Sequence, residues 1–237
     1  MLQHEYVLNL TTIKMKKSFN ILIFGFAAVL TFFPSCKERT QVQTPYTITE
    51  NGTTYLVQDS ILILTADGAK IHAIIVRNSE MQEPGPAVLF HTIYARKNDV
   101  DRARKAADHG YVGVVSYTRG KGLSPDSIVP YKYEARDTYQ VIDWISKQDW
   151  SNQKVGMYGG SYVGFTQWAA VKNRVHPALK TIVPSVSAAP GIAEPMENGI
   201  HWNFHYPWHH YVSNNRYLDT TLYYNGQQKN KNDTGKN

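Results

Sequence analysis

A serine lies between glycines and an aromatic residue in the stretch MYGGSYVGFTQW, residues 157–168. Gly159 lies two positions before Ser161, and Gly164 lies three positions after it. A short apolar run comes before this stretch and a helical pattern comes after it, so we expect Ser161 at a sharp turn from a strand into a helix. A hydroxyl exposed at such a turn can act as a nucleophile toward a carbonyl carbon.

The general sequence of a nucleophile elbow is G-x-S-x-G, with the last glycine two positions after the serine. This chain has Val163 at that position. Taken alone, Gly159 and Ser161 therefore more often indicate a simple glycine-rich turn than a catalytic one.

The elements that must position Ser161 can be read from the periodicity of apolar residues. Residues 60–76 predict a hairpin that turns at Asp67-Gly68. Further strands are expected within residues 85–94, 111–120, 154–161 and 179–188, and helices over 100–109, 134–148 and after Ser161. Strands that alternate with helices predict an α/β fold, with a mostly parallel sheet and flanking helices.

With these neighbours, the serine stretch resembles the X-Pro dipeptidyl-peptidase and cocaine esterase type of serine hydrolases, whose elbow is G-x-S-Y-x-G. The matching residues run from Gly159 to Gly164. The resemblance extends over most of residues 55–220, through DGAKIHAIIVR, YTRGKGLS and DWISKQDWSNQKVGMYG. It implies an α/β-hydrolase fold. One departure is Tyr117, where many members have an aspartate two residues before the arginine.

The resemblance also implies catalytic roles. Ser161 would attack the carbonyl of an ester or amide, and the backbone N–H of Tyr162 would donate to the resulting oxyanion. The hydroxyl of Tyr94, in the stretch LFHTIYARKND, would be the second donor. The chain contains 16 tyrosines, so the residue type alone would not single out Tyr94. His91 lies near the end of the same strand, where a hydrogen-bonded structural role is the more common one.

A serine nucleophile also needs a carboxylate and a histidine, which follow it in that order in this fold. Two glutamates and four histidines satisfy the order formally: Glu194, Glu197, His201, His205, His209 and His210. In the family, however, this region begins the helical cap, and the triad Asp and His follow later strands. We therefore expect a hydrolase fold truncated at the start of its cap, without its triad Asp and His.

The histidine-rich stretch HWNFHYPWHHY could also suggest a metal site, because His201, His205 and His209 recur at helical spacing. Pro207 lies among them and is expected to disrupt such a helix. The interleaved aromatic residues suit a substrate pocket better. We expect neither a metal nor a cofactor.

The beginning of the chain reads as an export signal. From Met15, a positively charged start leads into an apolar run over residues 21–33 and then to Cys36, the only cysteine. The run is shorter than the roughly 18 residues that a spanning helix needs. Ser35-Cys36 resembles a bacterial lipobox, which implies lipidation of Cys36 and a lipid-anchored protein of the cell envelope. An ordinary cysteine behind a cleaved signal is the alternative.

The net charge of +6 does not indicate a nucleic-acid partner. Residues 1–35 hold three lysines against one glutamate, and residues 228–237 hold three lysines against one aspartate, so only +2 remains for the body. We expect a small-molecule or peptide substrate, and the oligomeric state is not predicted.

These patterns divide the chain into five expected segments: upstream residues and signal peptide (1–36), linker (37–46), hydrolase domain (47–192), start of the helical cap (193–226) and polar tail (227–237). Two functions are expected of it. The first is a serine hydrolase that cleaves an ester or amide bond. The alternative is a catalytically inactive, lipid-anchored binding protein.

Overall fold

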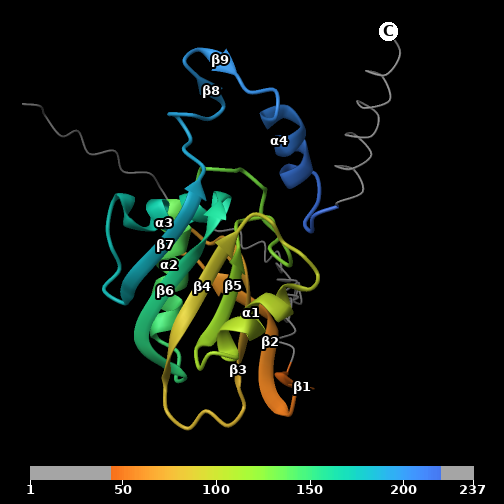
Figure 1. The fold of residues 1–237 in the computed structure, drawn as a ribbon, viewed down its shortest axis with the longest axis vertical. Coiled ribbons are helices and arrows are strands. Elements are labelled where there is room, and N and C mark those ends of the chain that lie inside the picture. Colours follow the sequence, from red (N-terminus) through yellow and green to blue (C-terminus); the bar gives the residue numbers. More distant parts are fainter. Residues whose placement is uncertain (1–43, 220–237) are drawn as a thin grey trace, which may run out of the picture. The chain divides into compact units, whose positions relative to one another are not determined.

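The computed structural model describes residues 44–219, so Cys36, the signal-peptide pattern and the expected tail lie outside the described residues. Within them, seven strands form one sheet in the order β1-β2-β3-β5-β4-β6-β7 (Figure 1). Their bounds are Tyr46–Glu50 (β1), Thr53–Leu64 (β2), Lys70–Asn78 (β3), Gly85–Thr92 (β4), Val112–Tyr117 (β5), Ser151–Ser161 (β6) and Leu179–Ser187 (β7).

The sheet is mixed. The strands β5, β4, β6 and β7 pair in parallel, whereas β1, β2 and β3 pair antiparallel with one another and β3 pairs antiparallel with β5. The hairpin predicted at Asp67-Gly68 is confirmed as the β2–β3 connection, where Gly68 has the positive φ of 86° that favours glycine. The alternation of strands and helices is confirmed as well.

Three helices cover the two faces of this sheet: α1 (Asp99–Ala107), α2 (Glu134–Ser146) and α3 (Tyr162–Lys172). Because side chains alternate along a strand, β3 contributes to both core layers. Its residues Ile71, Ala73 and Ile75 share a buried cluster with residues of α2 and α3. Its residues Ile74 and Val76 share the other cluster with residues of α1.

Residues 188–219, here called the cap segment, follow β7. They contain the short strands β8 (Met196–Glu197) and β9 (Ile200–His201) and the helix α4 (His205–Ser213). Figure 1 shows the cap segment beyond the carboxyl ends of the parallel strands. Ligands of open α/β sheets bind at this edge. None of the described helices is long and apolar enough to cross a membrane.

The structure has no single helix that carries His201, His205 and His209, as expected from Pro207, but a shorter helix forms around this proline. Helix α4 begins at His205, so Pro207 lies in its first turn. Backbone N–H groups of the first turn have no partner within the helix, and a proline therefore costs little there. His205 and His209 share this helix, whereas His201 belongs to β9. Among residues 44–219, no three His, Cys, Asp or Glu side chains are grouped so that they could hold a metal ion.

A buried lysine attaches the cap segment to the loop after β5. Lys121, in the loop after β5, is fully buried, and its Nζ donates to the carbonyl oxygens of Val212 (2.8 Å) and Asn215 (2.6 Å). These carbonyls lie at the C-terminal end of α4, where a cation is favourable. Burial lowers the pKa of Lys121 to about 8.

His91 lies within the sheet and does not reach the surface. It is fully buried at the end of β4, and its Nδ1 hydrogen-bonds the Ser116 hydroxyl of β5 at 2.7 Å. Burial lowers the pKa of His91 to about 4. The burial and the hydrogen bond of His91 therefore fit a structural role within the sheet.

We expect His91 to make the fold sensitive to acid. Its pKa is 6.5 when unperturbed and about 4 in the fold, so the unfolded chain binds the proton first as the pH falls. Stability that is present above pH 6.5 should be lost as the pH falls toward 4, by up to about 3 kcal/mol from this group. Urea unfolding at several pH values should show this loss in the wild type and a flatter profile in His91→Gln. Parallel profiles for the two proteins would show that His91 does not cause it.

Candidate active site

Ser161 has an unusual backbone conformation. It is the last residue of β6 and the N-cap of α3, with φ 56° and ψ −126°, and it is exposed. A positive φ is uncommon for a residue other than glycine, and such a strained conformation persists only where the surroundings enforce it. The structure thus places the predicted nucleophile at the strand-to-helix turn that the sequence indicates.

The glycines around Ser161 are required by close packing. A Cβ on Gly160 would lie 2.9 Å from the carbonyl oxygen of Ser185 in β7, and a Cβ on Gly164 would lie 2.9 Å from the Cα of Ser187. Gly159 has φ 128°. The elbow needs a glycine at position 164 because that residue of α3 faces β7. This contact explains why the elbow has G-x-S-Y-x-G spacing and tolerates Val163.

No base hydrogen-bonds the nucleophile in the described part of the chain. The Ser161 carbonyl accepts a hydrogen bond from the N–H of Ala188 at 3.1 Å. Its hydroxyl has no hydrogen-bond partner among residues 44–219, so none of the four histidines of the cap segment is bonded to it. The structure therefore brings the predicted nucleophile to the carboxyl edge of the sheet without a histidine hydrogen-bonded to its hydroxyl.

Tyr162, the residue after the nucleophile, is fully buried. Its hydroxyl donates a hydrogen bond to Oε1 of Glu134 and accepts one from the N–H of Tyr131 at 3.0 Å. Burial raises the pKa of the Tyr162 phenol well above its ordinary value. The side chain is therefore a neutral, fixed part of the core, and only the backbone N–H of Tyr162 remains as a candidate donor.

Tyr94 lies just after β4, half-buried, with its ring centroid 6.1 Å from that of Tyr162. Its hydroxyl oxygen accepts a hydrogen bond from the indole Nε1 of Trp208 in α4, at 3.1 Å. This bond uses a lone pair of the oxygen and leaves the O–H proton available for a further acceptor. The structure thus gathers the two predicted oxyanion donors, Tyr94 and Tyr162, in one aromatic cluster.

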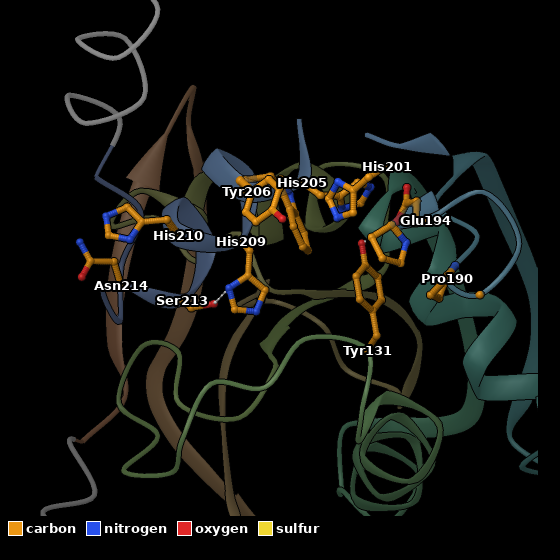
Figure 2. Close-up of a pocket in the computed structure, with 13 residues that line it drawn as sticks. Tyr131, Pro190, Glu194, His201, His205, Tyr206, His209, His210, Ser213 and Asn214 are labelled. Atoms are coloured by element: carbon orange, nitrogen blue, oxygen red, sulfur yellow. Dashed lines mark hydrogen bonds between the residues drawn. The ribbon is translucent and has the colours of Figure 1, made fainter. Parts of the chain in front are cut away.

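A pocket of about 750 Å³ opens beside this cluster (Figure 2). Its wall contains Tyr131 and Trp208, whose rings stack at 5.5 Å, and both rings also contact Tyr162. Ser161 is not part of the lining. The remaining lining residues are Pro190, Gly191, Glu194, Pro195, His201, His205, Tyr206, His209, His210, Ser213 and Asn214.

The pocket has one carboxylate in its lining. Glu194 accepts a hydrogen bond from the Tyr131 hydroxyl at 2.9 Å, and burial together with Glu194 raises the pKa of Tyr131. The histidines of the stretch predicted to form a pocket do line it, and Figure 2 shows them along α4 and β9. Aromatic and histidine side chains therefore dominate this surface.

The loop after β5 is fixed by an ion-pair network that joins a buried carboxylate, Asp137, and an exposed one, Asp67. Arg119 forms two hydrogen bonds to Asp137 of α2, both 2.6 Å, and two to Asp67 of the β2–β3 turn, at 2.9 and 3.0 Å. Tyr117, which replaces the aspartate of many relatives, donates its hydroxyl proton to Asp99 at 2.9 Å. The departure at Tyr117 is therefore accommodated by a partner at the start of α1.

Sequence reasoning missed three residues that shape this site: Glu134, Lys121 and Trp208. Glu134 begins the predicted helix of residues 134–148, and Trp208 lies in the histidine-rich stretch. Their types and positions were visible, but their partners lie 28 residues away for Glu134 and 114 for Trp208. No local pattern could indicate those contacts.

Several known proteins resemble this chain in sequence or in fold. Cocaine esterase from Rhodococcus sp. is 29% identical over 141 residues, which cover 57% of this chain and 24% of the esterase. The solved structure of an α-amino acid ester hydrolase is 25% identical with a TM-score of 0.61, and the match covers 78% of this chain and 34% of that one. An aminopeptidase from a marine sediment Thaumarchaeota archaeon matches in fold, with 22% identity, a TM-score of 0.55 and coverage of 82% and 34%.

The chain thus spans about a quarter of the esterase and about a third of the two solved structures. The predicted α/β-hydrolase fold is confirmed by the structural likeness. Residues 67–235 match the X-Pro dipeptidyl-peptidase family, S15. Most of the sequence, including the strand-to-helix turn at Ser161, is covered by this match, and the chain belongs to the X-Pro dipeptidyl-peptidase (S15) family.

Proposed function

We propose that this chain carries the nucleophile and the oxyanion site of a serine hydrolase that cleaves an ester or amide bond. The observation that carries the proposal is the conformation of Ser161, an exposed hydroxyl held at φ 56° and ψ −126° where β6 passes into α3. Such a strained turn is the structural requirement of a nucleophile elbow. Membership of the S15 family supports it.

In this proposal, Oγ of Ser161 attacks the carbonyl carbon of the substrate. The carbonyl oxygen becomes an oxyanion, and the N–H of Tyr162 and the O–H of Tyr94 donate to it. Each donor of this kind lowers the barrier by about 3 kcal/mol. Collapse of the tetrahedral intermediate expels the alcohol or amine and leaves an acyl group on Ser161, which water then removes. The proposed steps call for no metal or cofactor.

The proton of Ser161 must also pass to a base. No side chain among residues 44–219 hydrogen-bonds this hydroxyl, so none of them is placed to activate the serine as a base. Serine hydrolases without a complete triad still retain about 10³- to 10⁴-fold catalysis over water, from the oxyanion hole and substrate binding. We therefore expect only feeble hydrolysis of activated esters by these 237 residues.

The substrate is proposed to be a small molecule or peptide with an ester or amide bond. The pocket beside Tyr131 and Trp208 has the size and aromatic lining that suit such a ligand. Two relatives, an esterase and an amino acid ester hydrolase, support a substrate with an acyl group.

We further propose that the protein is exported and attached to a membrane of the cell envelope through a lipid on Cys36. The support is the sequence pattern of residues 15–36. Two or more acyl chains on one terminus are enough for stable attachment to a membrane.

Reactivity of Ser161 tests the hydrolase proposal. A fluorophosphonate probe should label the wild-type chain slowly, and Ser161→Ala should abolish the labelling because the nucleophile is gone. Tyr94→Phe should slow it by about 100-fold through loss of an oxyanion donor. The exposed Tyr111 provides a matched control, and Tyr111→Phe should label like the wild type. The labelled peptide is identified by mass spectrometry.

Two outcomes would contradict this picture. Labelling that survives Ser161→Ala would place the nucleophile elsewhere. Fast labelling that depends on Ser161 and on one of His201, His205, His209 or His210 would show that the cap segment does supply a base.

Fractionation of cells tests the proposed location. The wild-type protein should partition with membranes and incorporate radiolabelled fatty acid. Cys36→Ala removes the acceptor thiol, so that variant should be soluble or remain an unprocessed precursor. Wild-type protein that is wholly soluble and is processed at another residue would exclude Cys36 as the anchor.

A further inference from the structure

Glu134 is hydrogen-bonded to Tyr162, the residue that follows the proposed nucleophile. We propose that Glu134 is a positioning residue for the oxyanion site: its carboxylate fixes the phenol of Tyr162 and thereby aims the N–H of Tyr162. This inference rests on the proposed function and adds to it a residue that does not touch the substrate.

The carboxylate of Glu134 is 3% exposed, and both of its oxygens are occupied. Oε1 accepts from the Tyr162 hydroxyl, and Oε2 accepts from the N–H of Tyr133 at 3.0 Å. Within residues 44–219, no lysine, arginine or histidine forms an ion pair with Glu134. Its position as the first residue of α2 adds the favourable end of the helix dipole.

A buried carboxylate without a cationic partner is expensive. Desolvation of such a group costs several kcal/mol, and an apolar side chain of similar volume would often stabilise a fold equally well. Burial raises the pKa of Glu134 accordingly. Core packing alone therefore does not explain a glutamate at position 134, whereas the hydrogen bond to Tyr162 does.

Fixing the phenol also fixes the backbone of Tyr162. The hydroxyl makes two hydrogen bonds, to Glu134 and from the N–H of Tyr131, and the ring packs between the rings of Tyr131 (4.8 Å) and Phe165 (5.6 Å). A tyrosine side chain has only two rotatable bonds to its Cα. A ring held at both its oxygen and its faces therefore holds the peptide that donates to the oxyanion, and such donors must be aligned before reaction.

Asp137 provides a matched comparison on the same helix. It lies one turn after Glu134 and is 1% exposed. Its carboxylate bonds to Arg119, in the loop after β5, and not to the elbow. A substitution at Asp137 therefore perturbs the same helix without removing a hydrogen bond of Tyr162.

The test uses the full chain labelled with ¹⁵N-tyrosine, in which the amide signal of Tyr162 is the one lost in Tyr162→Phe. Glu134→Asp keeps the charge but withdraws the carboxylate, and Glu134→Ala removes it. Both should move the Tyr162 amide signal and speed its hydrogen exchange about tenfold. Glu134→Gln has the same side-chain length and keeps an acceptor oxygen for the Tyr162 hydroxyl. In this variant the position and the exchange rate of the Tyr162 amide signal should therefore resemble those of the wild type. Asp137→Asn should leave the signal in place.

Labelling of Ser161 by the fluorophosphonate gives the functional readout. Glu134→Asp and Glu134→Ala should slow it by about 10- to 100-fold through misplacement of the donor, and ester hydrolysis should lose kcat rather than gain KM. An unchanged Tyr162 amide signal in these variants, or an equal effect of Asp137→Asn, overturns the role of Glu134. Absence of Ser161 labelling in the wild type would instead refute the proposed function, because the amide signal reports on Glu134 without catalysis.

Discussion

The backbone of Ser161 is the constraint on which the rest of the site depends. Its φ of 56° and ψ of −126° cost of order 1–3 kcal/mol for a residue other than glycine. The surroundings enforce this conformation from two sides. On one side, Gly160 and Gly164 allow β7 to pack against the turn. On the other, Tyr162 is buried and bonded to the first residue of α2. The exposed Ser161 hydroxyl is therefore positioned by buried contacts of its neighbours.

The cap segment is coupled to this turn through aromatic side chains and one buried cation. Trp208 lines the pocket, stacks on Tyr131 and donates to the hydroxyl of Tyr94. Lys121 holds the C-terminal end of the same helix by two carbonyl oxygens. A movement of α4 would therefore change the shape of the pocket and the hydrogen bonding of the proposed oxyanion tyrosine together.

The sequence predicts those features of the fold and site that depend on near neighbours. The β2–β3 hairpin follows from Asp67-Gly68, and the strand-to-helix turn follows from the apolar run and the glycines around Ser161. The pairing of Glu134 with Tyr162 and that of Trp208 with Tyr94 could not be predicted, because they join elements that only the folded sheet brings together. The short helix α4 around Pro207 was not predicted for a different reason. A proline disrupts a helix interior, and the register that places it in the first turn of α4 was not evident from the spacing of the histidines.

A crystal structure of the chain after prolonged reaction with a small phosphonate would test the arrangement at Ser161 most directly. We predict phosphorus bonded to Oγ of Ser161, a positive φ retained at that residue, and the phosphoryl oxygen within about 3 Å of both the Tyr162 nitrogen and the Tyr94 hydroxyl. A Ser161 backbone relaxed to negative φ, or a phosphoryl oxygen in contact with neither donor, would contradict it.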